Sequence, residues 1–185
     1  MKILEATRID IPVLLDMEMY MELAQIQSLS ARDSLESVQF WDKWLPGLST
    51  YTLGRKKGYL LIFMDRAVEE EIDAIWEQAP ARGFRLQALV QTMILGCVRH
   101  MLPEVDSNQC APVPRPGEVL RKSLAEIGVQ LFDEGSLDYK YSTLTYYPYR
   151  GGCQICHMRD LCPKLNMPAW KGLFSKEEKA PGSPE

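Results

Sequence analysis

Three cysteines near the end of the chain are the residues whose type and spacing could do chemistry. Cys153, Cys156 and Cys162 form a C-x2-C-x5-C array, preceded by two glycines and followed directly by Pro163. Two cysteines separated by two residues can hold one metal, because the tight turn between them aims both sulfurs inward. Three thiolates also need positive charge nearby, which a cation or an iron–sulfur core supplies. The array therefore predicts a metal centre.

The cysteine array has three interpretations. An iron–sulfur cluster, most simply [4Fe-4S], is favoured, because a proline directly after the last cysteine is also found in bacterial ferredoxins. Zinc is the second, although zinc sites usually add another C-x2-C knuckle or a histidine pair, and this sequence has neither. Exposed or redox thiols without a metal are the third.

A fourth ligand would complete the centre, and Cys110 is the first candidate. It lies in a proline-rich connector, and a loop residue is exposed enough to reach the other cysteines. Cys97 lies on the apolar stripe of a predicted core helix, where cysteine commonly serves as a small buried hydrophobe. His100 and His157 follow cysteines closely, but histidines in such places more often pack or form hydrogen bonds than coordinate. A position left to water or substrate is the last alternative, and it would make the cluster catalytic.

The array resembles the iron–sulfur cluster segment of endonuclease III-type DNA glycosylases, of iron–sulfur RecB-like nucleases and of radical-SAM auxiliary-cluster domains. The resemblance covers the cysteine segment alone and implies an iron–sulfur cluster there. Tyr146 stands where the glycosylases have a further cysteine, and the sequence lacks the C-x3-C-x2-C of a radical-SAM core. Asp138-Tyr139-Lys140 matches the (D/E)-x-K with which the nucleases hold Mg²⁺. A chain of this composition contains such a triplet about once by chance, so the match has little weight.

Charge is distributed unevenly along the chain. The whole sequence has a formal net charge of -4, which argues against a surface that attracts nucleic acid everywhere. Residues 139–179, however, carry seven Lys and Arg against three Asp and Glu, a net charge of +4. Solubilising charge is the simplest interpretation of this basic tail. A docking surface for an acidic partner or for nucleic acid is the alternative.

The lengths of the apolar runs and the composition of the first residues indicate the compartment of the protein. Charges interrupt the first ten positions, so the sequence predicts no secretory signal. The longest apolar run, Tyr59 to Met64, is too short to cross a bilayer, and we expect no membrane partner. We expect a cytoplasmic protein, in which reduced thiols favour metal ligands or core residues over disulfides.

The elements that must position the cysteines follow from hydrophobic spacing and from Gly and Pro breakers. Helices are predicted over about residues 12–29, 33–45, 66–76, 83–101 and 116–131. Strands 49–53 and 59–64 are predicted to form a hairpin, and the Tyr- and Thr-rich strand 137–147 to pair with it. Residues 103–116 contain four prolines and are predicted to be an extended connector.

These elements predict an α+β fold, with a mainly helical body, a small antiparallel sheet and a C-terminal metal-binding loop. We expect one domain over residues 1–150, a cysteine-rich segment packed on it over 151–174, and a disordered tail over 175–185. The expected function is that of a small iron–sulfur protein, acting in electron transfer or as an accessory component with a protein partner. The alternatives are a nucleic-acid-processing or nucleic-acid-binding protein with a structural cluster, and a zinc-stabilised protein–protein adaptor. The sequence leaves open whether the chain is an enzyme.

Overall fold

A four-stranded antiparallel sheet forms the centre of the computed structural model, which describes residues 3–105 and 110–162. Its strands lie in chain order, and their bounds are β1 Ala6–Arg8, β2 Leu48–Leu53, β3 Gly58–Met64 and β4 Ser142–Tyr147. β2 and β3 form the predicted hairpin. The predicted pairing of the Tyr- and Thr-rich strand with this hairpin is confirmed, because Leu144 of β4 lies opposite Leu61 of β3.

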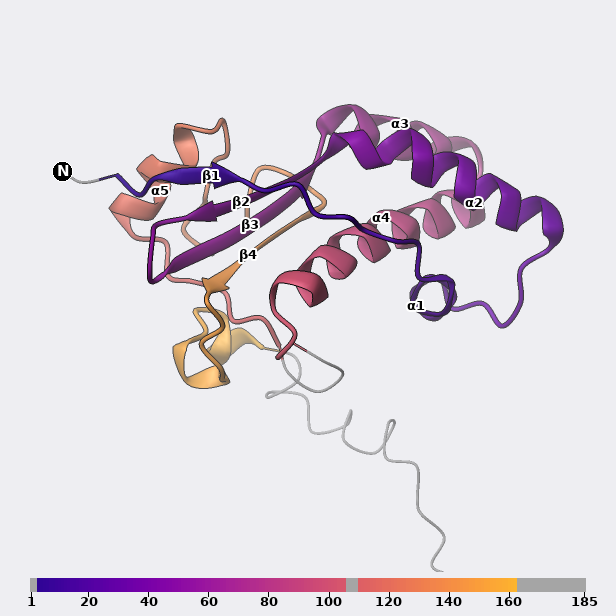
Figure 1. The fold of residues 1–185 in the computed structure, drawn as a ribbon. Coiled ribbons are helices and arrows are strands. Elements are labelled where there is room, and N and C mark those ends of the chain that lie inside the picture. Colours follow the sequence, from indigo (N-terminus) through magenta and orange to yellow (C-terminus); the bar gives the residue numbers. More distant parts are fainter. Residues whose placement is uncertain (1–2, 106–109, 163–185) are drawn as a thin grey trace, which may run out of the picture.

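Helices flank this sheet, and the predicted α+β fold is confirmed. The α-helices of the described residues are α1 Met17–Leu23, α2 Ala31–Trp44, α3 Arg66–Gln78, α4 Pro80–Met101 and α5 Glu118–Ala125. The 3-10 helices are η1 Leu45–Gly47, η2 Cys153–Ile155 and η3 Arg159–Leu161. Figure 1 shows α2, α3 and α4 gathered together, with α5 apart from them at the sheet.

The sheet separates two hydrophobic cores, because successive side chains of a strand point to opposite faces. Leu60, Ile62 and Met64 of β3 are buried on one face, in the core that α1 to α4 build. Leu61 and Phe63 are buried on the other face, with the apolar residues of α5. The predicted central helix is α4, whose apolar side forms a large part of the first core.

α1 is shorter than the predicted helix 12–29. Asp16 accepts a hydrogen bond from the Met19 N–H and thereby fixes the first turn of the helix. At the other end, Gln25 takes a left-handed conformation with φ 55°, and the Ile26 N–H donates back to the preceding helical turn. This is a Schellman-type ending with glutamine in the place that glycine usually takes. Local capping therefore limits a helix that the hydrophobic spacing alone would extend.

Other predicted elements have different limits. Ser30 caps α2, and its hydroxyl accepts the Asp33 N–H, so the helix begins at Ala31 rather than at the predicted residue 33. α5 ends at Ala125, and Leu131 instead forms an isolated β-bridge with Leu137. β1 was not predicted, because three residues are too few to show a hydrophobic period.

Parts of several predictions lie outside the described residues: 106–109 of the connector, 163–174 of the cysteine segment and the tail 175–185. The described parts of the connector contain no helix or strand before α5, as predicted. Within the described residues, no helix is both long and apolar enough to cross a membrane.

Candidate metal centre

The cysteine segment, residues 151–162, is built from two consecutive 3-10 turns. Cys153 begins η2, and the Cys156 N–H closes that turn by donating to the Cys153 carbonyl at 3.3 Å. Cys162 follows η3, and its N–H donates to the Arg159 carbonyl at 3.2 Å. The two turns contact each other, so the three cysteines belong to one compact piece of backbone.

Gly152 lets the chain enter this segment. Its φ of 107° and ψ of 153° lie in a region that is open essentially to glycine alone. A Cβ at this position would also lie 2.1 Å from Oε1 of Gln154. The glycine before Cys153 is therefore required by the backbone conformation.

His157 anchors the cysteine segment to the rest of the molecule. Its N–H donates to the Val113 carbonyl at 2.8 Å, and its Nε2 lies 3.2 Å from the Asp133 carbonyl oxygen. Gly135 completes the junction, because a Cβ there would lie 3.2 Å from both the His157 ring and the Val113 side chain. His157 thus forms structural hydrogen bonds, the commoner role that the sequence favoured for it.

The connector carries Cys110 toward this junction. The Thr145 hydroxyl of β4 donates to the Pro112 carbonyl at 2.9 Å, and both Pro112 and Pro114 are buried. The part of the connector around Pro112 therefore lies against the edge strand β4. Figure 1 shows the cysteine segment beyond the end of β4, close to this part of the chain. Cys110 lies two positions before the first of these fixed contacts.

The five cysteines differ in burial. Cys110 and Cys153 are exposed, and Cys156 and Cys162 are partly exposed. Cys97 is fully buried in the core of α4, and the Thr50 hydroxyl donates to its sulfur at 3.7 Å. Burial raises the pKa of the Cys97 thiol, which disfavours the thiolate that binds metals. The structure thus separates Cys97 from the other four by surroundings.

The donor types of the cysteine segment suit soft metals, because thiolates are preferred ligands of iron–sulfur clusters and of zinc. Among residues 3–105 and 110–162, however, no group of three or more His, Cys, Asp or Glu side chains is arranged to hold a metal ion. The segment therefore supplies the residue types and the backbone turns, whereas the thiols themselves are not gathered around one point. Metal binding and local ordering are commonly coupled in cysteine-rich segments.

The (D/E)-x-K triplet is part of a network of surface ion pairs. Asp138 accepts the Gln130 N–H at 2.8 Å and pairs with Arg66 of α3. The Lys140 ammonium pairs with Asp73 of α3. These partners occupy the carboxylate and the ammonium that the nuclease resemblance would assign to Mg²⁺ and the scissile phosphate.

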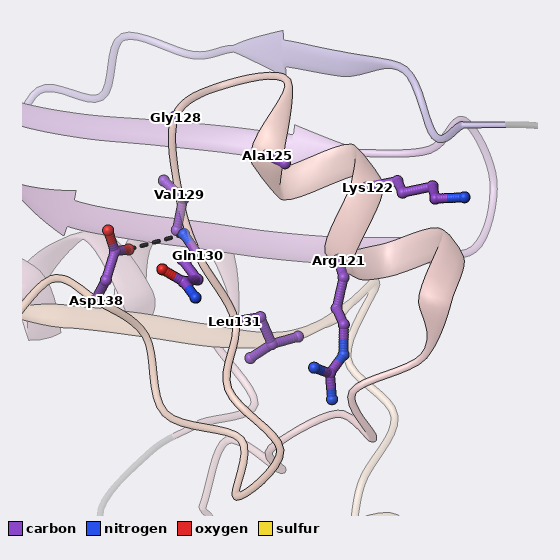
Figure 2. Close-up of a pocket in the computed structure, with 8 residues that line it drawn as sticks. All are labelled: Arg121, Lys122, Ala125, Gly128, Val129, Gln130, Leu131 and Asp138. Carbon is purple, nitrogen blue, oxygen red and sulfur yellow. Dashed lines mark hydrogen bonds between the residues drawn. The ribbon is translucent and has the colours of Figure 1, made fainter.

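A groove of about 550 Å³ lies between α5 and residues 128–131 (Figure 2). Two basic side chains of α5 line it, but Arg121 pairs with Asp133, and Lys122 pairs with Glu118 at 2.8 Å. Figure 2 also shows the Lys122 side chain extending away from the groove. The groove contains none of the cysteines, so it is separate from the candidate metal centre.

Two tyrosines on the neighbouring strands β3 and β4 pack against each other. The rings of Tyr59 and Tyr146 lie 5.5 Å apart, and the Arg150 guanidinium lies 5.4 Å from the centre of the Tyr146 ring. Side-chain packing across β3 and β4 accounts for these residues, which lie opposite each other in the sheet.

Sequence reasoning missed the residues that anchor the segment. Val113 and Asp133 contribute backbone carbonyls, which leave no mark in residue type. Among the anchoring residues, Gly135 is the one whose residue type is itself a signal. Its φ of 92° and its close contacts both require glycine. Comparison of the chain with family models, curated proteins and solved structures gives no match. The functional argument therefore depends on the cysteine segment and its surroundings.

Proposed function

We propose that the chain binds an iron–sulfur cluster, most simply [4Fe-4S], at the cysteine segment and acts in the cytoplasm as a redox or accessory component for a protein partner. The ligands in this proposal are Cys153, Cys156, Cys162 and Cys110. The hydrogen bond from the His157 N–H to the Val113 carbonyl carries the proposal. It ties the segment with three cysteines to the connector with the fourth.

The exposure of the thiols supports this assignment. Cys110 and Cys153 are accessible, and a thiol at the surface can lose its proton and turn toward a metal more easily than a buried one. A bound cluster supplies one-electron transfer or a cross-link between chain segments. The proposed set would join parts of the chain on either side of α5 and β4.

The surroundings of the segment favour a redox or accessory role with a protein partner. The groove of Figure 2 contains none of the four cysteines, so it is not a substrate pocket for the cysteine segment. Ile155 and Leu161 expose 36% and 75% of their surface within the same two turns. Exposed apolar side chains grouped at a site are typical of protein contact. This surface fits electron transfer to a protein partner, or binding of that partner, better than catalysis on a small molecule.

Purification under anaerobic conditions tests the proposal. We expect coloured protein with visible thiolate-to-iron absorption and about four iron and four sulfide per chain. Replacing any one of the four proposed ligands by serine should remove or degrade the cluster. Cys97→Ser is the matched control, because it removes a thiol from the core and should leave the iron content unchanged. Colourless protein with one zinc would overturn the cluster and favour a zinc-stabilised adaptor. A full cluster in Cys110→Ser would assign the fourth position to another ligand.

A further inference from the structure

The end of the sheet that carries the cysteine segment has an excess of positive charge. Gly58 of β3 lies opposite Tyr147 of β4, so the turn between β2 and β3 lies beside the residues that lead into the segment. Figure 1 shows this turn and the cysteine segment at the same end of the sheet. Residues 54–57 and 148–162 together form what we call the cationic end.

The cations of this end differ from most others of the molecule in having no ion-pair partner. Among the described residues, nine lysines and arginines form ion pairs with carboxylates. Seven form none, and four of these seven are exposed in the cationic end: Lys56, Lys57, Arg150 and Arg159. A fifth, Arg115, lies in the connector two positions after Val113, which binds His157. Only Arg8 and Arg32 lie elsewhere in the part of the chain that the structure describes.

The carboxylates around the cationic end are few and are engaged with other groups. Glu5 pairs with the remaining arginine of the turn. Asp133 pairs with a side chain of α5, and Glu134 accepts the hydroxyl of a neighbouring serine at 2.8 Å. Asp160 is the single acid in the sequence 148–162. The cationic end therefore keeps a net positive charge, which attracts acidic surfaces within a Debye length of about 8–10 Å.

Apolar side chains accompany these charges. Ile155 and Leu161 are exposed in the same segment as Arg150 and Arg159. Apolar residues bordered by charged ones are typical of protein–protein interfaces, which have an apolar core and a polar rim. Single-stranded nucleic acids are bound instead through aromatic side chains that stack on bases, and the Tyr146 ring beside Arg150 packs against another tyrosine. The surface therefore favours a protein over a nucleic acid.

We infer that the cationic end is the docking surface for the protein partner of the cysteine segment, and that the contacting surface of this partner is acidic. Opposite charges steer two proteins together and fix their relative orientation. Such steering suits the small, transient interfaces of electron-transfer complexes. The inference rests on the proposed function, which supplies the role of the partner, and adds the chemistry by which the partner is recognised.

Titration calorimetry with an acidic protein tests the inference, and flavodoxin, a small acidic redox protein, is the probe. We expect the full chain to bind flavodoxin at low salt and to bind it more weakly as salt increases. In the double variant Lys56→Glu/Arg150→Glu, the affinity should fall by at least about tenfold, because two attractions become repulsions.

The double variant Arg8→Glu/Arg32→Glu is the matched control. It changes the net charge by the same amount at unpaired cations outside the cationic end, so it should keep most of the affinity. Equal losses in the two variants, or no salt-sensitive binding of flavodoxin, would overturn the inference. Tighter binding of a single-stranded DNA oligonucleotide than of flavodoxin would also overturn it, in favour of a nucleic acid.

Iron analysis of the same samples separates this inference from the proposed function. Both variants should contain as much iron as the wild type, since neither changes a proposed ligand. A chain that takes up no iron but binds flavodoxin through the cationic end would refute the metal centre and support the docking surface. A chain with a full cluster and no binding of flavodoxin would refute the docking surface alone.

Discussion

Cys97 and Cys110 carry the same thiol in opposite surroundings. Cys97 is enclosed by the core of α4 and contacts the Thr50 hydroxyl, whereas Cys110 is exposed on the connector. A metal ligand must give up its proton, and burial of Cys97 raises the pKa at which this happens. At the scale of single residues, surroundings rather than residue type decide which cysteine is suited to ligation.

Replacing Cys97 by serine tests this distinction. The serine hydroxyl is more polar than the thiol and would lie in an apolar core, so we expect the free energy of unfolding to fall by about 1–3 kcal/mol. Chemical denaturation measures this loss, and metal analysis of the same sample should find unchanged iron. A lower iron content in Cys97→Ser than in the wild type would contradict the core role assigned to this residue.

Gly152→Ala tests the entry to the cysteine segment. The region of the backbone map at φ 107° and ψ 153° is closed to alanine, and a residue forced into such a region costs about 1–3 kcal/mol. The Gln154 side chain can swing away from the new methyl group, so backbone strain is the main effect. We expect reduced iron occupancy with little change in the melting of the sheet. Gly128→Ala, also at positive φ but with open space around it, controls for general strain.

Elements with a long or regular pattern were predictable from the sequence. The hairpin of β2 and β3, α3 with its Asp65 cap, and α4 all combine a clear period with turn or cap residues. The ends of α1 depend instead on capping geometry. In the candidate site, the cysteines were visible as a pattern. The carbonyls of Val113 and Asp133 could not be predicted, because any residue type supplies the same backbone acceptor.

The ending of α1 gives a prediction at this scale. Gln25 takes a left-handed conformation that a residue with a Cβ adopts at some cost. Gln25→Gly should therefore stabilise the protein, because it relieves about 0.5–1 kcal/mol of backbone strain. The larger conformational entropy of glycine in the unfolded chain offsets part of this gain. Gln27→Gly is the control, because Gln27 has no positive φ and glycine there should destabilise. Denaturant midpoints measure both, and a loss of stability in Gln25→Gly would contradict the capping argument.

Thiol and phenol groups that are buried or partly buried make the stability of the whole molecule sensitive to alkaline pH. Burial raises the pKa of Cys97 from 9.0, and those of Tyr20, Tyr59 and Tyr141 from 10.0. As pH rises, the unfolded chain releases these protons first, so the folded state binds more protons. The stability that these groups contribute is complete below their unfolded pKa values and is lost as pH rises toward the folded ones.

We therefore expect the free energy of unfolding to decrease from about pH 8 upward, by at most about 1.4 kcal/mol per pH unit for each such group. Urea unfolding at several pH values measures the slope. Cys97→Ala should flatten it at the lower end of this range, where the thiol would ionise in the unfolded chain. A slope that is the same in both proteins would show that Cys97 does not titrate differently on folding.

The contrast between an acidic whole and a basic tail leads to a binding prediction. The redox or accessory proposal requires no nucleic acid, so we expect no measurable binding of DNA or RNA at low salt. Binding that weakens steeply with salt would favour the nucleic-acid alternative. In that case Lys164→Gln and Lys171→Gln should each reduce the salt slope by about one unit. Fluorescence anisotropy with single- and double-stranded probes makes the measurement.

The junction of His157 with Val113 and Gly135 also bears on biogenesis. These three positions come from distant parts of the chain and meet only after β4 has paired with β3 and the connector has followed its edge. Contacts between distant segments form late in folding. Cluster delivery would therefore act on a chain that already has its sheet and its core. If the proposed cluster binds at this segment, newly made protein should accumulate as a folded, metal-free intermediate whenever iron supply is limiting.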